Sequence, residues 1–346
     1  MNRLIVILLL TAATASAQVR PVNTYSIVAR DAETGQMGVA VQSHWFSVGP
    51  IVTWAEAGVG AIATQSFADP SYGQLGLELL RAGKSAPDAL RALLTADQAC
   101  AVRQVAFVDA TGNVATFTGD RNIIAAGGIA GNRSGDAVKL SCGTLQSGAG
   151  FAVQANLMAN DKVWPAMAKA FEDAKGDLAA RMLAALDAAQ AVGGDIRGKQ
   201  SAALVVVKAE STGKPWADRL FDVRVDDHPE PLAELRRLVT VQRAYNHMNA
   251  GDLAVEHKDN EGALREYSAA ARLAATTPGV PQSRQAEMIY WHAVALVSMN
   301  RIDEALPLFA KAFSLEPSWR ELTPRLRASG LLPDDEALIR RIVNAR

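Results

Sequence analysis

The chain has 346 residues, which is long enough for two domains of ordinary size. It is 49% hydrophobic and 21% charged, a composition that excludes a disordered chain and a membrane-embedded one. The 35 basic and 36 acidic residues nearly cancel, so the net charge gives no sign of binding to nucleic acid or to an anionic membrane surface.

The N-terminus has the pattern of a cleavable signal peptide. Arg3 supplies a positive flank, residues 4–10 are apolar, and residues 15–17 (ASA) are small residues of the kind found at a cleavage site. The apolar run is too short for a transmembrane helix, which needs about 20 residues. We therefore expect residues 1–17 to be removed, and the mature protein, periplasmic or secreted, to begin near Gln18.

Short apolar runs separated by turn residues indicate strands after the signal peptide. Residues 25–30 and 37–41 are predicted to form a hairpin, because the polar segment between them ends in Gly35. Further strands are expected at residues 51–55, 60–64, 104–108, 114–117, 151–156, 201–208 and 220–225. Apolar residues at helical spacing predict helices at residues 71–83, 85–94, 163–174 and 178–191.

The two cysteines lie on either side of a strand pair. Residues 119–150 are rich in Gly, Ser and Asn, which predicts a long irregular loop that carries Cys142. In an oxidising compartment Cys142 and Cys100 form the one intrachain pair that the sequence allows. Spacing does not give the distance between them, so a disulfide and two separate buried thiols both remain open.

The order of elements is paired strands, two helices, paired strands, two helices, paired strands. Such a chain can stack two antiparallel sheets and place a helical layer outside each of them. We therefore predict an α+β fold with four layers, α-β-β-α, over residues 24–226. A plain α+β domain without this stacking is the alternative.

The β pattern stops at the proline-bearing acidic segment 227–231, which marks a domain boundary, and residues 232–346 are predicted to be all helical. Two stretches there share a register at an offset of 42 residues: Gly251, Ala254, Ala263, Tyr267 and Ala270 correspond to Ala293, Leu296, Ala305, Phe309 and Ala312. This order of small and aromatic residues resembles the tetratricopeptide repeat. Helices at residues 232–245 and 322–326 are expected to cap the two repeats, and a generic helical bundle is the alternative.

Five blocks of the first domain carry a family resemblance: residues 24–31 (TYSIVARD), 38–49, 54–61 (WAEAGVGA), 153–158 (VQANLM) and 193–203 (GGDIRGKQSAA). On these blocks the domain resembles the bacterial family catalogued as domain of unknown function 1028, which is placed in the Ntn-hydrolase superfamily. The resemblance implies an Ntn-hydrolase-like sandwich and, as a reaction class, amide hydrolysis.

The resemblance also implies a nucleophile, because Ntn hydrolases use the side chain of an N-terminal Thr, Ser or Cys with its own α-amine as the base. Thr24 is the candidate, since it opens the first strand, and Ser26 lies on the same face of that strand. Cleavage after Ala17 leaves residues 18–23 ahead of Thr24, so a second cut, between Asn23 and Thr24, is required. Otherwise both are ordinary strand residues.

Polar residues elsewhere are candidates for substrate binding. Ser43 and His44 end the second strand, and Asn156 shares a strand face with Gln154, so their amides can donate to a developing oxyanion. The block 193–203 gathers four further candidates at a glycine-rich turn: Asp195, Arg197, Gln200 and Ser201. Arg197 can bind a carboxylate, with Asp195 holding it in place, or the two can form a structural ion pair.

Two functions follow as hypotheses. The first is an exported Ntn-type amidohydrolase acting on peptide or cell-wall amides, with the helical repeats binding a protein or peptide partner. The second is a catalytically inactive binding or scaffold protein that uses the repeats for assembly. No cofactor or metal is expected, because the five histidines lack metal-ligand spacing and no phosphate-binding glycine loop occurs. The sequence leaves homo-oligomerisation open.

Overall fold

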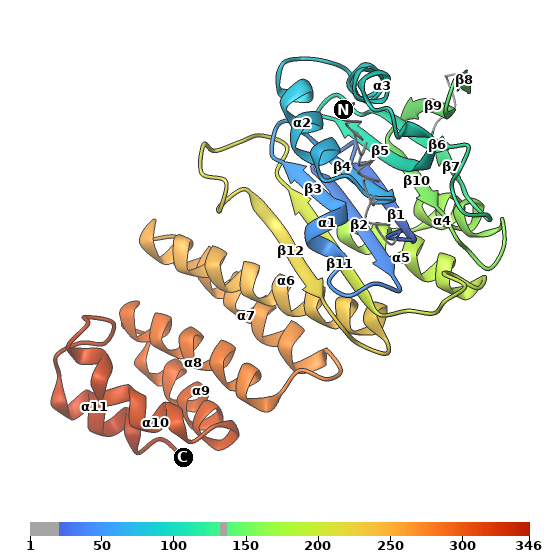
Figure 1. The fold of residues 1–346 in the computed structure, drawn as a ribbon. Helices are drawn as coiled ribbons and strands as arrows, with labels where there is room; N and C mark the ends of the chain where they lie inside the picture. The colour runs from blue at the N-terminus through green and yellow to red at the C-terminus, as the bar shows by residue number, and fades with distance from the viewer. Residues whose placement is uncertain (1–20, 132–136) are drawn as a thin grey trace, which may run out of the picture.

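The computed structural model describes residues 21–131 and 137–346, and within them two antiparallel sheets of six strands form the first domain (Figure 1). The first sheet contains, in spatial order, β12 (Arg219–Val225), β11 (Ser201–Val207), β2 (Met37–Ser43), β1 (Thr24–Arg30), β10 (Phe151–Ala155) and β7 (Gly127–Ala130). The second contains β3 (Thr53–Glu56), β4 (Gly60–Ser66), β5 (Arg103–Asp109), β6 (Asn113–Gly119), β9 (Gly143–Ala149) and β8 (Val138–Leu140). Residues 1–17, which the sequence predicts to be a signal peptide, lie outside the described part of the chain.

Helices cover the outer face of each sheet. The first sheet packs against α4 (Val163–Asp173) and α5 (Leu178–Ala191), and the second packs against α2 (Ser71–Arg81) and α3 (Ala86–Ala96). Both inner faces meet in a third apolar cluster between the sheets. The layers therefore run α-β-β-α, and the prediction of an α+β chain with two antiparallel sheets is confirmed.

The strand expected at residues 51–55 begins later than predicted. A short helix, α1 (Gly49–Val52), precedes β3, and Pro50 occupies one of its first positions. Proline fits the first turn of a helix because backbone N–H groups in that turn have no acceptor within the helix, so the absence of an N–H costs no hydrogen bond. The apolar run therefore divides into a helical turn and a four-residue edge strand.

The glycine-rich segment 119–150 is not an irregular loop where the structure describes it, so that prediction is wrong. It contains β7, β8 and β9. A Cβ on Gly127 would lie 2.6 Å from the ring of Trp164, and one on Gly143 would lie 2.4 Å from the ring of Phe117. These glycines allow aromatic rings to pack against strand backbone, which a turn-based interpretation of glycine cannot anticipate.

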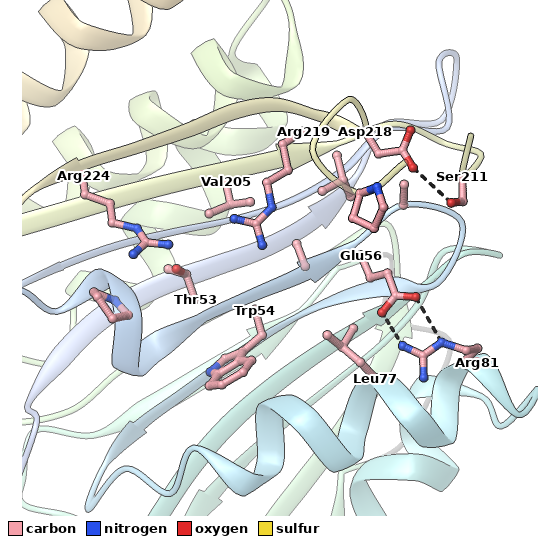
Figure 2. A pocket seen from close by; sticks show the side chains of 15 residues that line it. Thr53, Trp54, Glu56, Leu77, Arg81, Val205, Ser211, Asp218, Arg219 and Arg224 are labelled. Atoms are coloured by element: carbon pink, nitrogen blue, oxygen red, sulfur yellow. Dashed lines mark hydrogen bonds and ion pairs between the residues drawn. The ribbon is translucent and has the colours of Figure 1, made fainter. Parts of the chain in front are cut away.

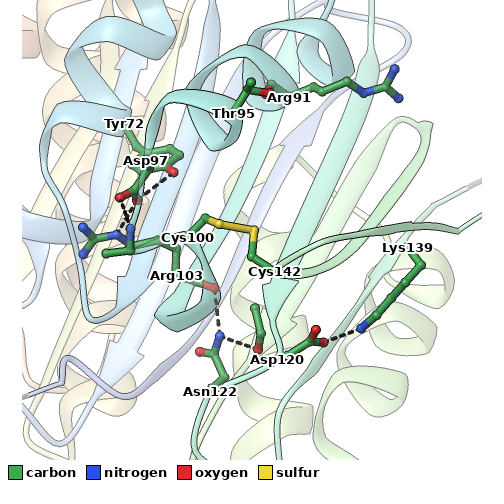
Figure 3. The surroundings of a disulfide bond; sticks show 12 residues. Tyr72, Arg91, Thr95, Asp97, Cys100, Arg103, Asp120, Asn122, Lys139 and Cys142 are labelled. Atoms are coloured by element: carbon green, nitrogen blue, oxygen red, sulfur yellow. Dashed lines mark hydrogen bonds and ion pairs between the residues drawn. A yellow bond between two sulfur atoms is a disulfide. The ribbon is translucent and has the colours of Figure 1, made fainter.

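Cys100 and Cys142 form a disulfide with a Cα–Cα distance of 5.9 Å (Figure 3). The bond joins the 3₁₀ turn η1 (Cys100–Val102) to the residue between β8 and β9. Arg103, which follows η1, has its Nε 2.8 Å from the carboxylate of Asp97, the residue after α3. Burial raises the pKa of Asp97, but the bonds from Arg103 and from the Ala99 N–H outweigh burial and bring that pKa below its usual value.

The C-terminal region is helical throughout its described length. It contains α6 (Pro231–Glu256), α7 (Asn260–Thr276), α8 (Gln282–Ser298), α9 (Ile302–Leu315), α10 (Ser318–Leu322), the 3₁₀ turn η2 (Thr323–Arg327) and α11 (Glu336–Val343). Helices α6 and α7 form one hairpin, and α8 and α9 form the next. The aromatic residue of each hairpin, Tyr267 or Phe309, is buried, and a Cβ on Gly251 would lie 2.9 Å from the ring of Tyr267.

Helix α6 belongs to both cores. Leu232, Leu235 and Val239 pack with the first sheet and α5, whereas Ala244 and Met248 pack with α7. Residues 232–245 are therefore the first half of a 26-residue helix and not a separate capping helix as expected. Within the described residues, no helix combines the length and apolar character needed to cross a membrane.

Candidate functional site

One end of the space between the sheets is polar and the other is apolar. Thr24 and Ser26 point into this space from β1, because the residues that alternate with them, Tyr25 and Ile27, face the helical layer. Both hydroxyl residues are fully buried. Farther along β1, Val28 continues the same face into the apolar cluster. The side chains expected to carry chemistry therefore lie inside the sandwich, at one end.

Two glutamines that the sequence did not single out complete this polar end. Gln65 on β4 donates from Nε2 to the carbonyl oxygen of Thr24 at 3.0 Å and to Gln104 Oε1 on β5 at 2.7 Å. Its Oε1 accepts the hydroxyl of Ser26 at 2.7 Å. Glutamine on a strand carries no local signal of function. The alternation of β4, with Ala61 and Ala63 facing inward, does place Gln65 on the inner face.

The candidate amide donors are occupied by this network. Asn156 Nδ2 donates to Gln104 Oε1 at 2.9 Å, and Gln104 Nε2 donates to the carbonyl oxygen of Ala155 at 2.9 Å. Gln154 Nε2 lies 3.1 Å from the carbonyl oxygen of Ala63 in the opposite sheet. These amides join the two sheets to each other, so their first role is to hold the polar end together.

The peptide bond between Asn23 and Thr24 is held by two of the predicted site residues. Ser43 Oγ donates to the carbonyl oxygen of Asn23 at 2.5 Å, and Arg197 Nη2 donates to the same oxygen at 2.8 Å. Asp195 fixes the guanidinium through Nε at 3.0 Å and Nη2 at 2.6 Å. The expected Asp–Arg pair therefore forms, and it also presents a positive charge to one backbone carbonyl.

Thr24 itself is part of an unbroken chain. Its hydroxyl lies 2.9 Å from the carbonyl oxygen of Val22 and 3.2 Å from Ser43 Oγ, and it can donate to one of them at a time. Val22 pairs with Ser66 at the end of β4 through two backbone hydrogen bonds, of 2.5 and 2.8 Å. Upstream residues therefore close this end of the sandwich above Thr24.

Three buried oxygen atoms at this end have no hydrogen-bond partner among the residues that the structure describes. They belong to Asn23, Ser66 and Asn156, which are all at most 2% exposed. A buried polar atom without a partner costs about 1–3 kcal/mol, and such atoms are rare in native proteins. Other described residues also carry such atoms, namely Arg30, Gln42, Asn122, His292 and Trp319, so this cost is not confined to the Asn23–Thr24 bond.

The remaining predicted residues lie outside this cluster. The backbone N–H of His44 lies 3.3 Å from Asp195 Oδ2, but the imidazole belongs to an exposed residue. Ser201 Oγ donates to the carbonyl oxygen of Trp45 and accepts the Val48 N–H at 3.2 Å, which shapes the turn after β2. Gln200 bonds Asp227 from its side chain, toward the domain boundary. The structure thus gathers Thr24, Ser26, Ser43, Asn156, Asp195 and Arg197 at the polar end, and His44, Gln200 and Ser201 make contacts outside it.

The comparisons with known proteins agree on one family. The model of the family described as "Family of unknown function (DUF1028)" matches residues 24–235. The chain is similar to the crystal structure of protein SPO2555 from Silicibacter pomeroyi, which carries the same family label. The two share 29% identity with a TM-score of 0.50, over 67% of this chain and 92% of that one. No curated protein matches the sequence.

Proposed function

This chain belongs to the DUF1028 family, and from that premise we propose that its sandwich domain is an N-terminal-threonine amidohydrolase activated by a cut between Asn23 and Thr24. The observation that carries the proposal is that Ser43 and Arg197 both donate a hydrogen bond to the carbonyl oxygen of Asn23. Two donors on one carbonyl form the arrangement that stabilises negative charge on oxygen when a nucleophile attacks the carbon.

The proposed cleavage of the Asn23–Thr24 bond proceeds as an acyl shift followed by hydrolysis. The Thr24 hydroxyl oxygen attacks the carbonyl carbon of Asn23 and transfers its proton to Ser43 Oγ, 3.2 Å away, while Ser43 donates its own proton to the carbonyl oxygen of Asn23. Arg197 stabilises the negative charge that develops on this oxygen before the proton arrives. The C–N bond then breaks, the proton passes from the Asn23 oxygen to the Thr24 nitrogen, and an ester joins Asn23 to the Thr24 side chain. Water hydrolyses this ester to an Asn23 carboxylate and a free Thr24 amine.

Once freed, that amine supports turnover of a second amide. An α-amine titrates near pH 8, so it can take the proton of the Thr24 hydroxyl at neutral pH. The site left by Asn23 keeps Ser43 and Arg197 as donors, which fit the carbonyl of an incoming substrate amide. Peptide and cell-wall amides are the substrate classes that we propose, in an exported protein.

The test is the N-terminus of protein isolated after export, read by intact mass and N-terminal sequencing. We expect a start at Thr24 and turnover of a panel of amide substrates. Thr24→Ala should start at Gln18 and have no turnover, whereas Thr24→Ser should retain both cutting and activity. Ser43→Ala and Arg197→Gln should slow the cut, and Thr95→Ala, which removes an exposed hydroxyl on α3, should not. Active protein that starts at Gln18 would reject the mechanism.

A binding protein without catalysis is the second candidate, and one observation favours it. The Val22–Ser66 pairing closes the end of the sandwich above a fully buried Thr24. If the exported protein starts at Gln18 and no amide is turned over, the sandwich serves as a scaffold. Function would then rest with the helical region.

For the helical region we propose a tetratricopeptide-like pair of hairpins that binds a protein or peptide partner. The support is the recurrence of small residues around a buried aromatic, with Ala263 and Ala270 around Tyr267 in α7, and Ala305 and Ala312 around Phe309 in α9. Export of the chain is part of the same proposal, and the Cys100–Cys142 disulfide is consistent with an oxidising compartment. A pull-down with the exported chain, with Tyr267→Ala as the disrupted variant, tests partner binding.

A further inference from the structure

A cavity of about 650 Å³ lies between the open edges of the two sheets (Figure 2). β3, the edge strand of the second sheet, forms one wall, and β12, the edge strand of the first sheet, forms the other. Val205 and Val207 of β11 lie between them as the floor. Cavities of this size accommodate small organic ligands.

Strand register places this cavity well apart from the threonine. Thr24 pairs with Ser43, and Ser43 pairs with Ser201 at the start of β11. Val205 is four residues farther along the same strand, which is about 13 Å at the usual rise of a strand. A ligand in the cavity therefore does not use the proposed nucleophile.

The β12 wall carries an excess of positive charge. Arg219 and Arg224 both point into the cavity (Figure 2). Both pair with one carboxylate, that of Asp222. Arg224 reaches Asp222 through Nε at 3.3 Å, so the Nη groups of its guanidinium remain available to a ligand. Both guanidiniums are partly exposed, 45% for Arg219 and 36% for Arg224. Two cations that share one anion leave a single positive charge to be matched.

The other charged groups at the cavity are matched. Arg81 donates from Nε to Glu56 at 3.0 Å. Asp218 is paired with Lys208, whose Nζ lies 4.0 Å from Oδ1, and it accepts the hydroxyls of Thr212 at 2.7 Å and Ser211 at 3.0 Å. The hydrogen bond from the Thr212 hydroxyl is the main cause that lowers the pKa of Asp218 below its usual value. The unmatched charge therefore lies at the β12 arginines.

The rest of the lining is apolar and fixed in place. Trp54 is anchored by a hydrogen bond from Nε1 to the carbonyl oxygen of Ile51 at 3.1 Å, and its ring lies against Gly73 of α2. Leu77 of α2 and the prolines Pro50 and Pro215 extend this surface. A preformed apolar surface beside a fixed cationic group suits a ligand with an apolar body and one negative end.

We propose that this cavity binds a small organic monocarboxylate with an apolar or aromatic body, its carboxylate bound by the Nη groups of Arg224 that Asp222 leaves available, beside Arg219. A guanidinium binds a carboxylate through two parallel hydrogen bonds, which gives direction as well as charge. A monocarboxylate matches the single unmatched charge, whereas a phosphate dianion would bring one charge too many.

Isothermal titration calorimetry on the full exported chain tests the site. The probes are phenylacetate, 4-phenylbutyrate and octanoate, each beside its neutral primary amide, together with inorganic phosphate. We expect at least one of the carboxylates to bind saturably, at one per chain, and its amide to bind about tenfold more weakly or worse, because the amide lacks the charge. The proposal is overturned if none of the three carboxylates binds, if an amide binds as tightly as its acid, or if phosphate binds more tightly than the acids.

Variants locate the binding. Arg219→Gln with Arg224→Gln should weaken the carboxylate about tenfold or more. Arg265→Gln, an exposed arginine of α7, is the matched control and should leave affinity unchanged. Thr24→Ala should also leave it unchanged, which separates this site from the proposed hydrolase. An unchanged melting temperature shows that the double variant is folded, and undiminished binding by that folded variant would overturn the proposal.

Discussion

The sandwich and the helical region are held together by different kinds of contact. In the sandwich, β1 pairs with β10 across more than a hundred residues of sequence, and glutamine side chains cross-link the sheets. In the helical region, neighbouring helices pair in chain order, and a buried aromatic fills each hairpin. Buried polar networks demand exact partners, whereas small-aromatic packing demands mainly volume.

This difference indicates which region should carry the chemical function and which region should tolerate substitutions. The polar end of the sandwich keeps unpartnered buried oxygens near the Asn23–Thr24 bond, and each lowers the stability of the fold. Helix α6 joins the two regions because its first half packs on the sandwich and its second half on α7. Three changes, taken from the largest expected effect to the smallest, test how far the regions are independent.

Gln104→Leu should be the most damaging. It removes the acceptor of Gln65 Nε2 and of Asn156 Nδ2 and leaves both donors buried, at about 1–3 kcal/mol each. We expect the free energy of unfolding to fall by about 3–5 kcal/mol in total.

The measurement is denaturant unfolding together with regional hydrogen exchange. The strands should lose protection while residues 260–315 keep theirs. Gln98→Leu, an exposed glutamine near the same sheet, is the control and should change stability by less than about 0.5 kcal/mol. Equal loss of protection in the helices would show that the two regions unfold as one unit.

Cys100→Ala with Cys142→Ala should have the second largest effect. The disulfide closes a loop of 42 residues, and removing such a closure costs about 2–4 kcal/mol through the entropy of the unfolded chain. Thermal unfolding of the double variant and of the reduced wild-type protein should agree. A double variant as stable as the oxidised protein would mean that the bond does not constrain the unfolded state.

Asp177 tests the junction and should have the smallest effect. It caps α5 by accepting the Ala180 N–H at 2.8 Å, and it accepts two bonds from Arg243 of α6, at 2.9 and 2.6 Å. Asp177→Ala should cost about 1–2 kcal/mol, from the lost cap and a half-exposed ion pair. Asp177→Asn keeps a capping oxygen and is the matched control, with an expected cost below about 1 kcal/mol.

The same carboxylate gives a pH dependence. Burial raises the pKa of Asp177, but the bonds from Arg243 and from the Ala180 N–H outweigh burial and lower it. A lowered pKa in the folded state means that the stabilisation is present above the unfolded value, near pH 3.9, and is lost as pH falls through the folded value. The stability difference between wild type and Asp177→Ala should therefore be full at pH 7 and shrink below about pH 4. A difference that grows in acid would contradict this account.

Much of the fold was predictable because its signals are local. Helices α4 and α5 and strand β11 match their predicted ranges to within a residue, since apolar spacing and caps such as Asp177 act over a single turn. The strands β7 to β9 were missed, because glycines that admit aromatic rings are indistinguishable in sequence from glycines of turns. The candidate residues Thr24, Ser43, Asp195 and Arg197 were named from family blocks, and Gln65 and Gln104 were not.

By itself, the sequence determined the class of fold, the change from strands to helices near residue 230, and the face of β1 that carries Thr24 and Ser26, because all three follow from periodicities of a few residues. Only the tertiary structure decided that Arg197 reaches Asn23, that Gln104 joins the two sheets, and that Arg219 and Arg224 line a cavity with Trp54. These contacts depend on how strands that are far apart in the chain pair in register. That register minimises the free energy of the whole core and leaves no mark in any single segment.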